Sequence, residues 1–409
     1  MSTSQPTRPR VAALTALATA VAVVLPAGAV AAAPARPAEP APVTRSQLQH
    51  EAERILRDAG YVGISVQVRD GRRRLHAAAG TADLATGRPV RHAAPFRAAS
   101  LTKAFVATVV LQLAAEKRLS LDDTVERWLP GVVTGNGNDG SRVTVRHLLQ
   151  HTSGIHDYAP AEDTGSSAEA FERTRFDHHD PAELVAGAMR HRPDFPPADP
   201  NDPAPDWNYS NPGYAVLGMI IERVTGAPWD RQVRDRLARP LGLEHTYAPG
   251  DDPRMPRGSA HTYHRFPGSG PWVDTTVRNM SWAGPAGALV TDEKDVDRFL
   301  SALHGGRLLP AAQLDQMRRT VPASAEFQED FPGLHYGLGA MRQPLSCGGY
   351  RWGHGGDLEG QTVRTAVSQD GRRSVVLNAT GRKGDPAWFA RAEKVLQGLL
   401  DHAMCAPVR

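Results

Sequence analysis

One stretch of the sequence has no polar face. Residues 101–117 have a helical pattern, and their apolar side chains fall on nearly every side of the expected helix. Such a helix is stable only when other elements cover it all round, so it belongs at the centre of a domain. The chain can supply that cover, because its 409 residues, 41% of them hydrophobic, suffice for one large or two ordinary domains.

Before this helix the sequence predicts another one. Ser46 with Gln49 three residues later resembles a capping box, and Gly60 follows the last helical position near Asp58. We therefore expect a helix from Ser46 to about Asp58.

Strand and helix patterns divide the remaining chain into three parts. A hairpin comes first, residues of about 131–284 follow with mainly helical patterns, and strands return near the C-terminus. Strands are expected at 63–68, 75–79, 347–352, 362–368 and 373–378, and helices at 143–151, 214–225, 292–304 and 386–403. This order predicts an α/β (α+β) fold whose first and last parts share one core, with a helical insert at about 131–284.

The N-terminus has the pattern of a secretory signal peptide. A basic start precedes an apolar run over 11–30, and Ala29-Val30-Ala31 has the small residues that a signal peptidase needs. A membrane anchor is the alternative, but the run contains a proline and is rich in alanine, which makes it weakly hydrophobic. We expect residues 1–31 to be removed, residues 32–43 to form a Pro/Ala linker, and the secreted protein to keep no membrane span.

Composition excludes several kinds of partner. The formal net charge is +3, only five of the 47 basic residues are lysine, and no basic stripe with interleaved aromatic residues occurs. A nucleic-acid partner is therefore not expected. The Asp-His-His-Asp stretch at 177–180 is a weak metal candidate, because no His-Glu-x-x-His pattern accompanies it. We expect a monomer that needs no metal or other cofactor.

The two cysteines are Cys347 and Cys405. Two cysteines cannot make a four-ligand zinc site, and the chain has no Cys-x-x-Cys pattern. In an exported chain an even pair is the usual sign of a disulfide. We expect a bridge that ties the last helix to the strand before His354.

A serine and a lysine lie one helical turn apart at the start of the apolar helix. Ser100 and Lys103 share one face of that helix. A desolvated lysine can take the proton of an adjacent serine hydroxyl and make it a nucleophile. For this the pKa of Lys103 must fall by about 3 units from about 10.4, which burial can impose. The alternative is a helix-capping serine beside a lysine with a buried stem.

Two further motifs carry polar groups suited to the same chemistry. In Tyr209-Ser210-Asn211 the phenol can relay protons, and the amide can bind a substrate carbonyl and the lysine, although Ser-Asn-Pro-Gly is also good turn sequence. His354-Gly355-Gly356 follows an expected strand, where small residues let a substrate backbone approach. A second copy, His304-Gly305-Gly306, ends a helix and is interpreted as a structural C-cap.

Together, Ser-x-x-Lys, Tyr-x-Asn and His-Gly-Gly resemble the motif set of the serine penicillin-recognising enzymes. This family includes class C β-lactamases, D-alanyl-D-alanine carboxypeptidases, and their esterase and D-aminopeptidase relatives. The resemblance covers about residues 45–405. Leu148 to Gly154 (LLQHTSG), Tyr336 to Gly339 (YGLG) and Leu345 to Gly348 (LSCG) match as well, the last two being similar to the secreted Streptomyces-type carboxypeptidase.

The resemblance implies a β-lactamase/transpeptidase-like fold over residues 44–405. This fold has an antiparallel sheet flanked by helices and an inserted all-helical domain. The resemblance also implies that Ser100 is the acylated nucleophile and that Lys103 and Tyr209 transfer protons. Asn211 would contact the substrate and the lysine.

The third motif supplies the remaining implied roles. His354 would be its polar group, and Gly356 would let the substrate approach. The N–H groups of Ser100 and Asp357 would form the oxyanion hole.

Two departures from the family pattern concern the substrate. Carboxypeptidases commonly carry Thr or Ser where this chain has Asp357, and a like charge there would repel a terminal carboxylate. If Asp357 turns away, or pairs with Arg342 or Arg364, only its backbone N–H would act in the site. The arginine-rich stretch of the family is reduced to Arg342. These changes favour a substrate with an amine or a neutral group at that point.

We therefore expect an exported serine hydrolase that forms an acyl-enzyme with peptides or amides containing D-amino acids, possible substrates being cell-wall stem peptides. It would be D-alanyl-D-alanine carboxypeptidase-like. The alternatives within the family are a carboxylesterase, a β-lactamase and a D-aminopeptidase. A non-catalytic penicillin-binding or cell-wall-binding protein is the alternative from another class.

Overall fold

The computed structural model describes residues 41–409 except 158–166, 200–201 and 268–269. The predicted signal peptide (1–31) and most of the predicted linker (32–43) lie outside the described residues. Residues Pro40–Arg409 form one compact unit. Among the helices of the described residues, none is both long and apolar enough to cross a membrane.

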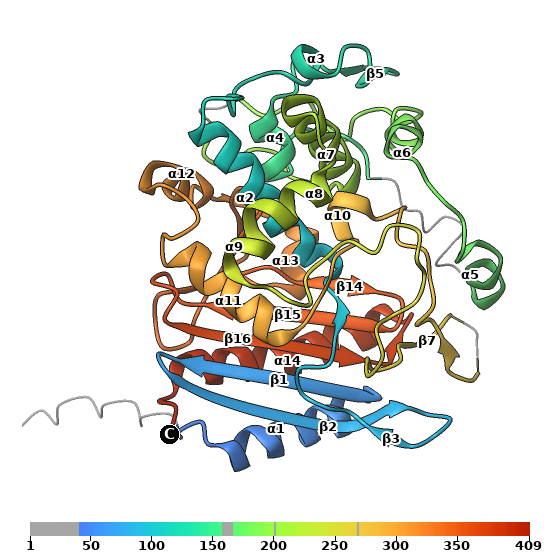
Figure 1. Ribbon diagram of the computed structural model, residues 1–409, viewed down its shortest axis with the longest axis vertical. Coiled ribbons are helices and arrows are strands. Elements are labelled where there is room, and N and C mark those ends of the chain that lie inside the picture. Colours follow the sequence, from blue (N-terminus) through green and yellow to red (C-terminus); the bar gives the residue numbers. More distant parts are fainter. Residues whose placement is uncertain (1–40, 158–166, 200–201, 268–269) are drawn as a thin grey trace, which may run out of the picture. The chain divides into compact units, whose positions relative to one another are not determined.

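Ten strands of the described chain form one antiparallel sheet (Figure 1). Their order is β10-β11-β12-β13-β15-β16-β1-β2-β3, and β14 pairs with β15. They are β1 (Gly63–Asp70), β2 (Arg73–Asp83), β3 (Arg88–Pro89), β10 (Val321–Pro322), β11 (His335–Tyr336), β12 (Met341–Pro344), β13 (Tyr350–Gly353), β14 (Gly356–Leu358), β15 (Gln361–Val367) and β16 (Arg373–Thr380). The predicted antiparallel sheet is confirmed.

The two ends of the chain meet in this sheet. β1 pairs with β2 on one side and with β16 on the other, so Val66 lies opposite both Ala77 and Leu377. The predicted sharing of one core by the first and last parts of the chain is confirmed.

Helices α1 (Arg45–Ala59) and α14 (Pro386–Cys405) cover one face of the sheet (Figure 1). The predicted N-cap of α1, Ser46, is wrong. Thr44 has extended backbone angles, and its side chain accepts a hydrogen bond from the Gln47 N–H at 3.2 Å. Gly60 ends the helix in the left-handed conformation, as predicted.

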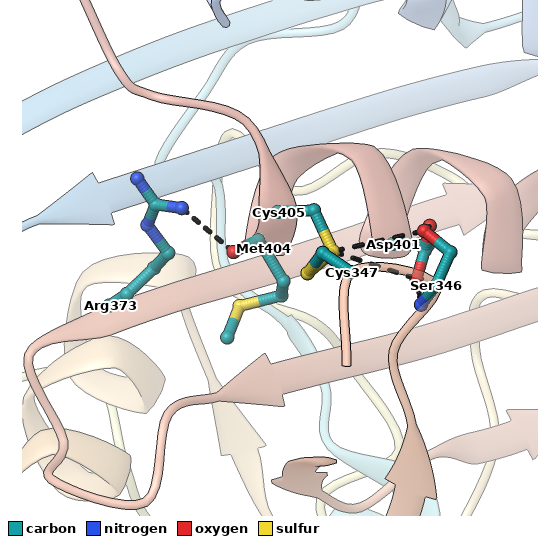
Figure 2. The surroundings of a disulfide bond; sticks show 6 residues. All are labelled: Ser346, Cys347, Arg373, Asp401, Met404 and Cys405. Atoms are coloured by element: carbon teal, nitrogen blue, oxygen red, sulfur yellow. Dashed lines mark hydrogen bonds between the residues drawn. A yellow bond between two sulfur atoms is a disulfide. The ribbon is translucent and has the colours of Figure 1, made fainter. Parts of the chain in front are cut away.

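The disulfide fixes the end of α14. Cys347 and Cys405 are bonded, which confirms the predicted pair (Figure 2). Next to the bridge, Asp401 of α14 accepts hydrogen bonds from the N–H and hydroxyl of Ser346. The Arg373 guanidinium donates to the Met404 carbonyl at 2.7 Å and joins the same helix to β16.

The apolar helix α2 (Thr102–Ala115) lies on the opposite face of the sheet. Every residue from Thr102 to Leu111 is buried, as the sequence predicts. Alternation along β16 separates the two faces, because Val376 packs in the core of α2 whereas Val375 and Leu377 pack in the core of α1 and α14.

In residues 131–284, helices α4 (Val145–Gln150), α6 (Pro181–Ala188), α7 (Asn211–Thr225) and α8 (Trp229–Val233) pack in the same core as α2 (Figure 1). Near α2 and in this stretch the structure also contains α3 (Val125–Trp128), α5 (Ala168–Thr174) and α9 (Arg239–Leu241), and α10 (Gly284–Gly287) follows at its end. Short strands interrupt the helices, namely β5 (Thr134–Gly135), β6 (Asn138–Asp139), β7 (Tyr263–Arg265) and β8 (Val273–Asp274). The limits of the insert stay a prediction.

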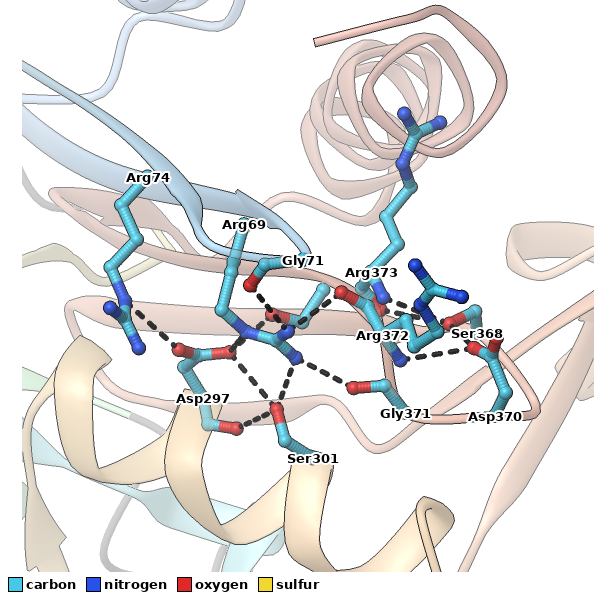
Figure 3. A network of polar contacts seen from close by, with 11 residues as sticks. Arg69, Gly71, Arg74, Asp297, Ser301, Ser368, Asp370, Gly371, Arg372 and Arg373 are labelled. Carbon is cyan, nitrogen blue, oxygen red and sulfur yellow. Dashed lines mark hydrogen bonds and ion pairs between the residues drawn. The ribbon is translucent and has the colours of Figure 1, made fainter.

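A buried ion pair joins helix α11 (Glu293–His304) to the sheet (Figure 3). Arg69 of β1 donates to Asp297 of α11 at 2.6 Å, and both side chains are less than a tenth exposed. The same guanidinium donates to the Gly371 and Arg372 carbonyls in the β15–β16 turn. One buried cation therefore connects a helix, a strand and a turn.

We expect Asp297→Ala to lower the free energy of unfolding by about 3–5 kcal/mol, because it leaves the Arg69 guanidinium buried without a counter-charge. Arg74→Ala is the matched control. Its side chain is 55% exposed and lies 3.6 Å from the same carboxylate, so its loss should cost at most about 1 kcal/mol. Urea unfolding of both variants decides, and equal effects would contradict the role of the buried pair.

Candidate active site

Ser100 lies in the 3-10 turn Ala99–Leu101 that leads into α2. Ala99 has a φ of 50°, a left-handed conformation that non-glycine residues seldom adopt. β14 passes close to this turn, because a Cβ on Gly356 would lie 2.8 Å from the Ser100 nitrogen and from the Ala98 oxygen. Only glycine permits this approach, so the third motif meets the first at the Ser100 backbone.

The Lys103 amine is buried among three oxygen atoms. Nζ lies 3.1 Å from Ser100 Oγ, 2.7 Å from Asn211 Oδ1 and 2.8 Å from the Ala286 carbonyl oxygen. The side chain has no exposed surface, and burial lowers the pKa of Lys103 to about 7. A neutral amine can donate to the amide and carbonyl oxygens and turn its lone pair to the Ser100 hydroxyl.

Tyr209 lies beside this amine. Lys103 Nζ is 4.7 Å from the centroid of the phenol ring. Burial raises the pKa of Tyr209 well above its usual value, against the lowering effect of Ser100. The buried hydroxyl has no hydrogen-bond partner of ordinary geometry in the described chain. Tyr209 is therefore a phenol with a proton to donate.

His151 supports the loop that carries Tyr209. Its ring lies 4.3 Å from the Tyr209 ring, centroid to centroid. Nδ1 accepts a hydrogen bond from the Ser210 N–H at 3.1 Å. The sequence shows this histidine only as part of the LLQHTSG match, without a role.

Asn211 is the first residue of α7, and Ser210 is its N-cap. Its amide oxygen accepts from Lys103, and its amide nitrogen donates to Asp157 at 3.1 Å. Asp157 was not among the residues expected at the site. Its only signal in the sequence is its place just after the LLQHTSG match.

His354 is held by two hydrogen bonds. Nδ1 donates to the Gly355 carbonyl oxygen at 2.6 Å, and Nε2 accepts from the Tyr336 hydroxyl at 2.8 Å. Burial lowers the pKa of His354 to about 3, so the ring is neutral. Tyr336 belongs to the YGLG match but had no expected role.

The structure changes the interpretation of Asp357. Its carboxylate forms an ion pair with Arg364 at 3.0 Å and accepts from the Thr362 hydroxyl at 2.9 Å. Although burial alone would raise the pKa of Asp357, Arg364 and Arg382 hold it below its usual value. An unpaired charge that repels a substrate carboxylate is therefore the wrong interpretation, and the pairing with Arg364 is the correct one.

Arg342 lies next to the cavity without lining it, and its role in substrate binding stays a prediction. Its neighbours on β12, Met341 and Gln343, line the cavity next to Ser100, but Arg342 does not. Side chains alternate along a strand, and the Arg342 guanidinium lies 4.5 Å from the Tyr350 ring instead.

The cavity at Ser100 has a volume of about 380 Å³, within the usual range for small-molecule sites. Beyond the catalytic candidates its lining is mixed, with apolar, charged and neutral polar side chains. The apolar side chains are Phe327, Phe331, Met341, Trp352 and Phe389, and the charged ones are Glu326, Asp330, Arg351, Asp357 and Arg364.

One group in the described chain has the composition of a metal site. His245, Asp292 and Asp295 offer ligand atoms within 4.8 Å of one another. These groups already form hydrogen bonds with one another. His245 Nδ1 lies 2.7 Å from Asp292 Oδ2, and the backbone N–H of His245 donates to Asp295. In the 177–180 stretch, His178 contacts Asp180 and Asp251.

Known proteins share this fold. The family model described as Beta-lactamase matches residues 48–400. Penicillin-binding protein 4 of Amycolatopsis lactamdurans is 32% identical over 255 residues, 60% of this chain and 61% of the relative. Esterase EstB of Burkholderia gladioli is 36% identical over 200 residues, 47% of this chain and 48% of the relative. The chain thus matches less than two thirds of either relative's length.

Two solved structures are matched over nearly their whole length. A D-stereospecific amidohydrolase from Streptomyces sp. is 41% identical with a TM-score of 0.75, over 85% of this chain and 98% of that one. The D-amino acid amidase of Ochrobactrum anthropi SV3 complexed with D-phenylalanine is 26% identical with a TM-score of 0.73, over 87% and 97%. The chain belongs to the beta-lactamase family.

Proposed function

We propose that this protein is a serine amidohydrolase that cleaves amides and short peptides of D-amino acids through an acyl-enzyme on Ser100. One observation carries the proposal, namely the buried Lys103 amine between Ser100 Oγ and two fixed acceptors. The likeness to a D-stereospecific amidohydrolase over 85% of the chain supports the substrate class.

In acylation, neutral Lys103 takes the proton of Ser100, and Oγ attacks the carbonyl carbon of the substrate. The negative oxygen that forms lies within reach of the N–H groups of Ser100 and Asp357. When the C–N bond breaks, the Tyr209 phenol gives its proton to the leaving nitrogen, and the ammonium of Lys103 returns a proton to Tyr209. The products are the acyl-enzyme and a free amine.

In deacylation a water molecule takes the place of the amine. Neutral Lys103 accepts its proton while its oxygen attacks the acyl carbon, and the proton then goes to Ser100 Oγ as the ester bond breaks. The products are the free D-amino acid and the starting enzyme.

The cavity supports an apolar side chain on the substrate. Phe327, Phe331 and Met341 line it beside Ser100, and a buried aromatic side chain gains about 1.5–3 kcal/mol from such a surface. Arg342 was the cation expected to bind the terminal carboxylate of a substrate, but it does not line the cavity. We therefore place amides of large apolar D-amino acids first.

A second candidate is carboxypeptidase action on peptides that end in D-Ala-D-Ala. One observation favours it: Arg351, which is 6% exposed, lines the same cavity. Its guanidinium donates to Gln343 and Gln397 and supplies a positive charge near the substrate.

We also propose that the enzyme acts outside the cytoplasm. The support is the secretory pattern of residues 1–31 and the disulfide, since such bonds persist in oxidising compartments.

A labelled fluorophosphonate should modify Ser100 and no other residue. Ser100→Ala should lose both the label and amide hydrolysis, because the reacting oxygen is gone. Peptide mapping by mass spectrometry locates the adduct, and an adduct on another serine would refute the assignment.

Activity should rise with pH through about 7, where Lys103 loses its proton and becomes a base. The kcat/KM for a neutral amide is measured from about pH 5 to about pH 9. Lys103→Ala should reduce it by several orders of magnitude and abolish the rise near pH 7. Lys117→Ala, at an exposed lysine beyond the end of α2, is the control and should leave the profile unchanged.

D-Phe amide should be hydrolysed at least about 100-fold faster than L-Phe amide, as expected from the likeness to a D-stereospecific amidohydrolase. It should also be hydrolysed faster than D-Ala amide, because Phe327, Phe331 and Met341 of the cavity bind the larger side chain. A matched peptide ending in D-Ala-D-Ala completes the panel. If the peptide has the highest kcat/KM, the carboxypeptidase candidate replaces the amidase.

A further inference from the structure

Asp157 holds Asn211 by its backbone and by its side chain. Oδ1 accepts a hydrogen bond from the Asn211 N–H at 2.8 Å, and Oδ2 accepts from Asn211 Nδ2 at 3.1 Å. The Asp157 side chain is half-buried, directly after the strongly buried segment 151–155.

This contact decides which way the Asn211 amide faces. An ionised carboxylate only accepts hydrogen bonds, so it must meet the NH₂ group of the amide. The amide oxygen then faces the opposite way, where Lys103 Nζ lies 2.7 Å away. A flipped amide would place two donors against the amine and leave it without one of its acceptors.

The Asp157 carboxylate also acts on the charge of the lysine. Its negative charge favours the protonated amine and works against burial, which lowers the pKa of Lys103. The same burial raises the pKa of Asp157. The two groups therefore influence each other's protonation across the Asn211 amide.

Other titratable groups face this pair. The phenols of Tyr209 and Tyr214 and the imidazoles of His151 and His354 surround Lys103. Burial raises the pKa of both phenols and lowers the pKa of both imidazoles. These shifts favour the neutral form of all four groups.

Beside Asp157 lies His156, whose ring contacts Asp194 at 2.7 Å. It lowers the pKa of Asp157.

We infer that Asp157 is a positioning residue for the proposed reaction: it orients the Asn211 amide toward Lys103 and, through its charge, sets the pH at which Lys103 becomes a base. The inference rests on the proposed function only in taking Ser100 as the nucleophile and Lys103 as its base. It needs no particular substrate.

The test is the rate at which a fluorophosphonate modifies Ser100, measured from about pH 5 to about pH 9. Asp157→Asn should react about 10- to 100-fold more slowly at the plateau, because the amide loses its fixed orientation. The midpoint of the rise should move to lower pH by on the order of half a unit to one unit, because the lysine loses a nearby negative charge.

Asp157→Glu separates charge from geometry. It keeps the negative charge but is one methylene longer, so the rate should fall while the midpoint stays near that of the wild type. Asp194→Asn is the matched control. It removes a negative charge that contacts His156 and accepts from Asn208 at 2.6 Å in the same region, without touching Lys103, and its midpoint should move far less.

A role limited to capping α7 predicts a different result. Asp157→Asn would then lower the melting temperature but leave the midpoint of the labelling rate unchanged, and this outcome overturns the inference. The inference is also overturned if Asp157→Asn has the same labelling rate and midpoint as the wild type. If Asp157→Asn does not fold, an unchanged rate in Asp157→Glu overturns it. Absence of labelling in the wild type overturns both proposals, whereas labelling without hydrolysis of D-amides overturns the substrate alone.

Discussion

The burial of one amine organises this molecule. Lys103 lies in helix α2, in which every residue from Thr102 to Leu111 is buried. Its side chain therefore has no surface exposed to water. A buried polar group is tolerated only with hydrogen-bond partners. The partners come from three distant parts of the chain, Ser100, Asn211 and Ala286. Helices α7 and α10 must therefore both pack against α2 before the amine has all its hydrogen-bond partners, and the same packing brings Asn211 to the site.

Much of the fold follows from local patterns in the sequence. The hairpin of β1 and β2, the apolar helix α2 and the closing helix α14 have clear periodicity, and each forms where it is predicted. The start of α1 differs from the prediction. Thr44 and Ser46 are both good capping residues, and the extended backbone angles of Thr44 make it the N-cap. Strands of two residues, such as β5 and β8, escape prediction because two residues show no alternation.

The site divides in the same way. Ser100, Lys103, Tyr209, Asn211 and His354 lie together, as the family resemblance of their motifs implies. Asp157 and Tyr336 act through partners more than 15 residues away, and no local pattern marks such contacts. Asp357 and Arg342 show the limit for charged residues on strands. The sequence shows that both residues are charged. Their positions on the strands decide that Asp357 pairs with Arg364 and that Arg342 does not line the cavity.

The groups around Ser100 differ in protonation although all are buried. Loss of water lowers the pKa of Lys103 to about 7 and raises the pKa of Tyr209, because it disfavours the charged form of each. Near neutral pH the amine can therefore accept a proton while the phenol still has one to give. Acylation needs both at once, since Ser100 must lose a proton and the leaving nitrogen must gain one. When Lys103 becomes an ammonium in this step, the negative charge nearest to it across Asn211 is Asp157. In the proposed reaction, the carboxylate that orients the amide therefore also stabilises the ammonium that forms on Lys103.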